Sequence, residues 1–123
     1  MALGLLPFAA SAAERPTDPL ARHILAGRWN EAEEELARVR GRLDVDPLEV
    51  LFLTGMLAQG QKQYDRAVDA FRRILDQQPG LVRVRLELGR TLFDMRDDEA
   101  AKFHFERALS GGLPDPVQVN VQR

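Results

Sequence analysis

Apolar residues recur along most of the chain at the three- and four-residue spacing that lines one face of an α-helix. No segment shows the strict alternation of apolar and polar positions that is typical of a half-buried strand. The predicted helices cover residues 18–26, 30–42, 47–60, 64–77, 81–94 and 98–110, and a seventh begins within 115–123. The pattern therefore predicts an all-α fold.

Capping residues support these boundaries. Three Asp-Pro pairs each combine an N-cap oxygen with a proline suited to the first helical turn. They are Asp18-Pro19, Asp46-Pro47 and Asp115-Pro116. We also expect Asp97 to cap a helix start, and Ser110, which precedes two glycines, to lie at a helix end.

The sequence repeats itself with a period of 34 residues. A shift by this period superposes identical residues, namely Gly55 and Gly89, Ala67 and Ala101, Phe71 and Phe105, Arg73 and Arg107, and Leu75 and Leu109. A glycine inside a helix costs about 1 kcal/mol relative to alanine. Its recurrence at one register therefore predicts that a neighbouring helix lies too close for a Cβ atom.

A third, weaker copy precedes these two. It carries Gly27, Trp29, Ala32, Leu36 and Val39, with Ala32 lying 35 residues before Ala67. The three copies predict about three helical hairpins.

The repeat resembles the tetratricopeptide repeat, a helix-turn-helix unit of the same length. Residues 48–81 carry Gly55, Tyr64, Ala67, Phe71 and Pro79 at the signature positions, and residues 82–114 carry Leu88, Gly89, Leu92, Ala101, Phe105 and Ala108. Leu51 and Arg85 stand where that family favours tryptophan, and Thr54 where it favours leucine. The resemblance implies an α-solenoid whose first helices line a concave groove that binds proteins or peptides.

The last third of the chain has a narrower resemblance. The run from Arg83 to Arg123 is similar to the end of the tetratricopeptide region in surface lipoprotein assembly modifiers. The similar segments are Arg85-Leu86-Glu87-Leu88, Leu92-Phe93, Phe105-Glu106-Arg107-Ala108-Leu109, and Leu113-Pro114 through Val117 and Asn120. That family comprises outer-membrane proteins of Gram-negative bacteria in which a periplasmic helical domain precedes a transmembrane β-barrel. The resemblance implies a periplasmic domain attached to the outer membrane, with a barrel following Arg123 and surface lipoprotein as the cargo.

The N-terminal residues 1–13 are uncharged and resemble a signal peptide. The apolar run 2–10 is too short to span a bilayer, which needs roughly 20 residues, and small residues precede the first charge at Glu14. Because no basic residue precedes the apolar run, we expect the true start to lie upstream. A buried N-terminal helix is the alternative. The repeat domain is expected at 14–114, followed by the start of another helix at 115–123, within a chain that continues further.

Composition excludes several functions. Lys and Arg number 17 against 19 Asp and Glu, and the net charge of −2 offers no general attraction for nucleic acid or an anionic membrane. The absence of cysteine excludes disulfides, thiolate nucleophiles and Cys-ligated metals. We therefore expect no nucleic-acid partner and no membrane insertion by this segment.

The polar residues give catalysis little support. His23 and His104 are the only histidines, lie 81 positions apart, and have no partner at metal-ligand spacing. We expect His104 to be a half-exposed helix residue. The acidic run 94–99 lacks the glycine and alternating ligands of a calcium loop and favours a solvated turn. No catalytic residue, metal or cofactor is proposed, and an enzyme is the least supported class.

Eight residues form the candidate protein-binding groove. They share one register on two first helices: Glu49, Phe52, Met56 and Gln59 on one, and Arg83, Leu86, Arg90 and Phe93 on the other. The resemblance to the tetratricopeptide repeat implies that this register faces the concave surface. Such a lining suits an extended or partly unfolded polypeptide with some acidic side chains. We expect Arg83 and Arg90 to be solvent-accessible because no acidic partner is evident one turn away. Leu86 and Phe93 have core packing as their alternative role.

Two non-enzymatic functions remain open at this point. The first is a periplasmic domain that binds cargo for an outer-membrane translocation system. The second is a generic periplasmic scaffold that serves envelope assembly or polysaccharide export and binds envelope proteins. The reading frame beyond Arg123 would distinguish them. The lysine and asparagine set with which carboxylate-clamp repeats bind chaperone C-termini is missing from the groove positions.

Overall fold

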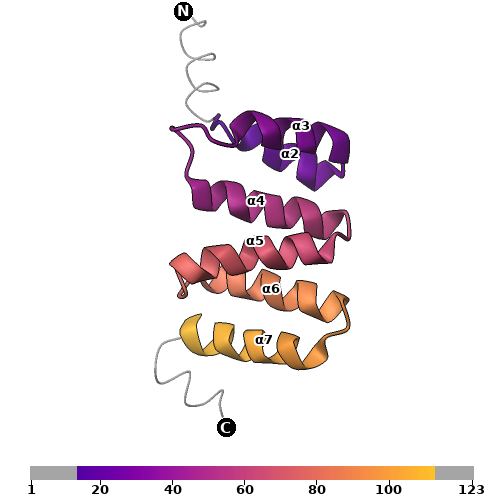
Figure 1. Cartoon of the computed structure of the whole chain (residues 1–123), viewed down its shortest axis with the longest axis vertical. Helices are drawn as coiled ribbons and strands as arrows, with labels where there is room; N and C mark the ends of the chain where they lie inside the picture. The colour runs from indigo at the N-terminus through magenta and orange to yellow at the C-terminus, as the bar shows by residue number, and fades with distance from the viewer. Residues whose placement is uncertain (1–13, 113–123) are drawn as a thin grey trace, which may run out of the picture. The chain divides into compact units, whose positions relative to one another are not determined.

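The computed structural model describes residues 14–112, which form six α-helices and, over that range, no strand (Figure 1). The helices are α2 (Asp18–Ala26), α3 (Trp29–Val39), α4 (Pro47–Gly60), α5 (Tyr64–Gln77), α6 (Val82–Asp94) and α7 (Asp98–Gly112). The predicted all-α fold is confirmed. The expected signal peptide and the helix expected at 115–123 lie outside the described residues.

Two predicted helix ends are wrong. Helix α3 ends at Val39, three residues early, because Arg40 is extended and Gly41 has a φ of 83°, in the left-handed region that favours glycine. Helix α7 continues through Gly112, so Ser110 lies within the helix rather than at its end.

Three predicted capping residues, Asp18, Asp46 and Asp97, lie among the described residues, and two of them are confirmed. The Leu48 amide donates to Asp46 Oδ1 at 2.9 Å, and the Ala100 amide donates to Asp97 Oδ1 at 3.3 Å. Asp18 is not the N-cap, because α2 already begins at this residue and Thr17 precedes it. The Asp18 carboxylate instead accepts a hydrogen bond from the Arg15 amide at 2.7 Å.

The chain divides into two compact units between Val50 and Leu51. In the first unit, α2 packs against α3, and the buried apolar side chains are Leu20, Ala32, Leu36, Val39 and Val45. In the second unit, α5 packs against α6 and α6 against α7. The largest side chains buried there are Leu57, Phe71, Ile74 and Leu88.

The two repeat-related glycines mark the close helix contacts that the sequence predicts. A Cβ atom placed on Gly55 would lie 2.5 Å from the Phe71 ring, and one placed on Gly89 would lie 2.7 Å from the Phe105 ring. Both distances are shorter than real Cβ contacts, so the ring from the second helix of each hairpin occupies the space of the missing side chain. This contact positions α4 and α6, which carry the candidate site.

Candidate functional site

Helices α4 and α6 carry seven of the eight predicted groove residues in the second unit. We call this surface the α4–α6 face, and its members are Phe52, Met56, Gln59, Arg83, Leu86, Arg90 and Phe93. Leu86 is 40% exposed and Phe93 59% exposed, which excludes core packing as their role in the described structure. Phe52 and Met56 are half-buried.

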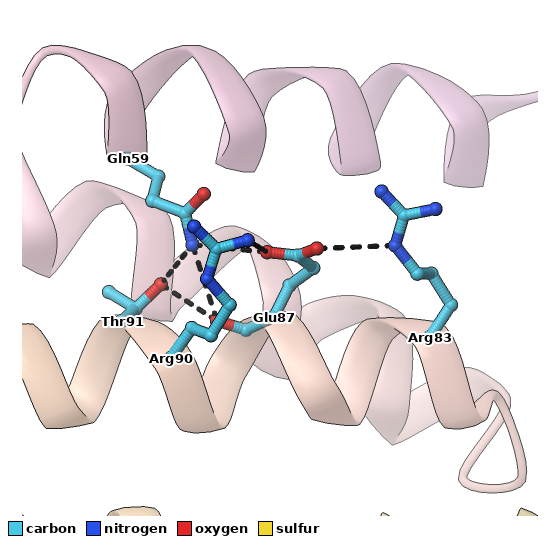
Figure 2. A network of polar contacts seen from close by, with 5 residues as sticks. All are labelled: Gln59, Arg83, Glu87, Arg90 and Thr91. Atoms are coloured by element: carbon cyan, nitrogen blue, oxygen red, sulfur yellow. Dashed lines mark hydrogen bonds and ion pairs between the residues drawn. The ribbon is translucent and has the colours of Figure 1, made fainter.

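A single buried carboxylate organises the two arginines (Figure 2). Glu87 Oε2 accepts from Arg83 Nε at 3.2 Å, and Glu87 Oε1 lies 3.5 Å from Arg90 Nη1. The Glu87 side chain is 7% exposed, whereas the Arg83 and Arg90 side chains are 66% and 62% exposed. The buried Glu87 carboxylate therefore forms ion pairs with both exposed arginines.

Helix α4 contributes to the same network through Gln59. Its amide nitrogen donates to Thr91 Oγ1 at 3.0 Å and lies 3.3 Å from Glu87 Oε1. Thr91 is fully buried and donates its own hydroxyl to the Glu87 carbonyl one turn earlier, at 2.9 Å. Among the described residues, no buried side-chain polar atom lacks a partner. The network thus fixes Glu87 between the two helices, and Glu87 in turn orients both arginines.

An aromatic contact adds to this arrangement. The Arg83 guanidinium lies 5.3 Å from the centroid of the Phe52 ring, within the range of a cation–π interaction. Phe52 is itself held against Phe71, with the ring centroids 5.9 Å apart. The α4–α6 face therefore combines fixed positive charge with exposed apolar surface.

The expectation that Arg83 and Arg90 lack an acidic partner is wrong, although both are solvent-accessible as predicted. Glu87 follows Arg83 by four residues and precedes Arg90 by three, which are the spacings at which helical side chains meet. The sequence carries this signal. The roles of Gln59 and Thr91 depend on how α4 and α6 pack, which the sequence does not state.

Glu49 belongs to the first unit and has other partners. Its carboxylate lies 2.9 Å from Arg15 Nη2 and accepts a hydrogen bond from the Thr17 hydroxyl at 2.7 Å. This hydroxyl is therefore directed to Glu49 and does not cap α2. The described contacts of Glu49 stabilise the start of the first unit.

An open hollow of about 740 Å³ lies beside the α4–α5 turn. Its lining includes Lys62, Tyr64, Asp65, Asp94 and Met95, and none of the predicted groove residues. Within residues 14–112, no group of three His, Asp or Glu side chains could hold a metal ion. In the same range, no helix is both long enough and apolar enough to cross a membrane.

Comparison with known proteins finds one matching family and similar proteins in two bacteria. Residues 18–105 match the family described as the N-terminal tetratricopeptide repeats of the surface lipoprotein assembly modifier. Over 77 residues the chain is 31% identical to surface lipoprotein assembly modifier 1 of Neisseria meningitidis, which covers 63% of this chain. Over 84 residues it is 30% identical to the surface lipoprotein assembly modifier of Pasteurella multocida, which covers 68% of this chain. In both cases the match spans 16% of the relative's length. No solved structure matches the chain.

Proposed function

Because this chain belongs to the surface lipoprotein assembly modifier family, within its N-terminal tetratricopeptide repeats, we propose that it is a periplasmic protein-binding domain. In this proposal it helps an outer-membrane translocation system to recognise or deliver surface lipoprotein cargo. Helical repeats of this kind bind polypeptides along a surface built from successive hairpins. The α4–α6 face is the surface that we assign to this role.

The observation that carries the proposal is the arginine pair held by Glu87. A guanidinium has five N–H donors, and the described contacts of Arg83 and Arg90 with Glu87 use one nitrogen of each. Because Glu87 is buried and both arginines are mostly exposed, the remaining donors are available to a partner. Two cations and one anion leave a local charge of about +1 on this face.

The neighbouring apolar side chains define the rest of the cargo's chemistry. Exposed Leu86 and Phe93 lie on the same helix face as the arginines, and half-buried Phe52 lies beneath Arg83. An extended polypeptide that alternates acidic and apolar side chains would match both features. We therefore propose that the cargo presents a segment of this type.

The test removes the two arginine charges together with the buried carboxylate that they neutralise. Replacing both arginines alone would strand Glu87, and an uncompensated buried charge can cost 3–5 kcal/mol of stability. The informative variant is therefore Arg83→Gln/Glu87→Gln/Arg90→Gln, which removes all three charges together. In calorimetry with a surface lipoprotein from the same genome, we expect this variant to bind about tenfold or more weakly, with the largest loss at low salt.

Glu87→Gln alone is the matched control. It retains both arginines, frees them from their shared carboxylate and raises the local charge from about +1 to about +2. Binding of an acidic cargo should therefore be preserved or strengthened. Equal cargo affinity in the wild-type protein, the triple variant and the control, with unchanged melting temperatures, would place the cargo site elsewhere.

A further inference from the structure

A second group of basic side chains lies on α5, α6 and α7 and is not part of the α4–α6 face. We call it the basic cluster, and its members are Arg72, Arg85, His104 and Arg107. Arg85 Nη1 lies 3.1 Å from His104 Nδ1, and Arg85 Nη2 donates to the Pro79 carbonyl at 3.1 Å. Because a guanidinium only donates, His104 Nδ1 is the acceptor, which is the arrangement of a neutral imidazole.

The aromatic ring of Phe103 contacts two members of the cluster, His104 and Arg107. The rings of Phe103 and His104 meet edge to face, with centroids 5.1 Å apart. The Arg107 guanidinium lies 5.9 Å from the Phe103 centroid. Arg72, Phe103 and Arg107 are exposed, whereas Arg85 and His104 are half-buried. Within the cluster, Arg85 and His104 are therefore half-buried, and the guanidinium-bearing side chains of Arg72 and Arg107 are exposed.

The basic cluster has no described counter-charge. Elsewhere in residues 14–112, a carboxylate lies within ion-pair distance of Arg15, Arg22, Arg38, Arg42, Arg73, Arg83 and Arg90. No described carboxylate reaches Arg72, Arg85 or Arg107 in this way. Among the described residues, Arg28, Arg40 and Arg96 also lack such a carboxylate. What distinguishes Arg72, Arg85 and Arg107 is that the charges of all three act on one histidine, His104.

The electrostatics of His104 agree with this geometry. Burial and then the charges of Arg85, Arg72 and Arg107 lower the pKa of His104 below its ordinary value of 6.5. These charges come from each helix around the ring, with Arg72 on α5, Arg85 on α6 and Arg107 on α7. Burial and the charge of Arg107 likewise lower the pKa of Arg85. Both groups are therefore in a positive environment that a bound anion would relieve.

We propose that the basic cluster binds a phosphate group. A phosphate monoester carries about −1.5 to −2 charges and three strong acceptor oxygens, which suits several guanidinium donors better than a single carboxylate does. The exposed side chains of Arg72 and Arg107 would contact the arriving anion first. The half-buried side chains of Arg85 and His104 would line the floor of the site. Exposed Phe103 beside Arg107 provides apolar surface for the group that carries the phosphate.

The two histidines provide a direct test in the intact protein. Sulfate is a suitable probe because it remains a dianion across the pH range in which histidine titrates. An anion next to His104 favours the protonated ring, so sulfate should raise the pKa of His104 and bind more tightly as pH falls. His23 serves as an internal control, because its described cationic contact is Arg28 alone, at 2.9 Å. NMR titration at constant ionic strength, with chloride replaced by sulfate, measures both rings.

Charge-removing variants link the effect to the cluster. In Arg72→Gln/Arg107→Gln, the sulfate-free pKa of His104 should rise towards 6.5 and the sulfate-induced shift should largely disappear. We expect sulfate affinity to fall about tenfold for each arginine removed. Arg40→Gln is the matched control, because Arg40 is exposed and lies outside the cluster, in the first unit. A His104 pKa that does not respond to sulfate in the wild-type protein would overturn the proposal.

Three further ligands identify the chemistry and its source. Tighter binding of succinate than of inorganic phosphate would overturn the assignment to phosphate. Wild-type binding to vesicles that contain phosphatidic acid, with loss in Arg72→Gln/Arg107→Gln, would support a lipid headgroup as the source. Binding of inorganic phosphate without binding to these vesicles would support a soluble phosphate compound.

Discussion

Gly55 and Gly89 occupy helix positions where a phenylalanine ring from the following helix excludes any side chain. A Cβ atom at either glycine would approach the ring to 2.5 or 2.7 Å. Alanine has a better helix propensity than glycine by about 1 kcal/mol, so propensity alone favours replacement. The ring contact opposes it, because Phe71 is fully buried and Phe105 half-buried between packed helices. The balance between these effects can be measured.

We expect Gly89→Ala to destabilise the protein by about 1–3 kcal/mol, the usual cost of inserting a methyl group into a packed site. Chemical denaturation measures this change. Gly80→Ala is the matched control, because a Cβ atom there meets nothing within 4 Å and the backbone does not need a positive φ. The double variant Gly89→Ala/Phe105→Leu should lose less stability than the sum of its single variants. Higher stability of Gly89→Ala would contradict the described contact.

The candidate site illustrates what residue-level sequence reasoning can predict. The register of α6 places Arg83, Leu86 and Phe93 on one exposed face, and their exposure follows from that register. The sequence also predicts the ion pairs of Glu87, since this residue lies about one helical turn from both arginines. The sequence does not predict the hydrogen bond between Gln59 and Thr91, because it joins residues 32 positions apart and depends on how closely two helices approach.

At the scale of the element, helix existence follows from periodicity, and helix ends depend on local backbone geometry. Helix α4 is apolar on almost every side, and Asp46-Pro47 locates its start better than periodicity does. Apolar spacing predicts the end of α3 three residues too late, because it cannot reveal that Arg40 is extended and that Gly41 has a positive φ. The 34-residue repeat was more informative, because it identified the packing alanines and glycines directly.

Ala101 tests this packing at the interface between α6 and α7. It is buried and equivalent by the repeat to Ala67, which is fully buried in α5. Ala101→Arg must bury a charge or separate two helices, and either should cost several kcal/mol. Because a domain of this size has about 5–15 kcal/mol of stability, most of it should be lost. Ala37→Arg makes the same change at an exposed position of α3 and should leave the melting temperature nearly unchanged. Equal melting temperatures for the two variants would contradict the described register.

At the scale of the whole molecule, the net charge of −2 conceals two local positive surfaces in the second unit. The α4–α6 face contains its own buried carboxylate, whereas the basic cluster has no described acid. Because the two surfaces use different arginines, each set of variants can be tested for its effect on the function proposed for the other surface. The triple variant of the α4–α6 face should leave the sulfate response of His104 intact, and Arg72→Gln/Arg107→Gln should leave cargo affinity intact.

Export is the prediction that concerns the molecule as a whole. Residues 1–13 carry no charge, and small residues precede Glu14, as a signal peptidase requires. If this segment is a signal peptide, the mature chain should begin at Ala13 or Glu14. The Glu14 carboxylate lies 3.2 Å from Arg22 Nη2, so a chain cleaved before Glu14 would keep this contact. Intact-mass analysis of the periplasmic fraction, after expression from the native gene with its upstream region, measures the processed end. An uncleaved chain in the cytoplasm would contradict export and, with it, access of the α4–α6 face to periplasmic cargo.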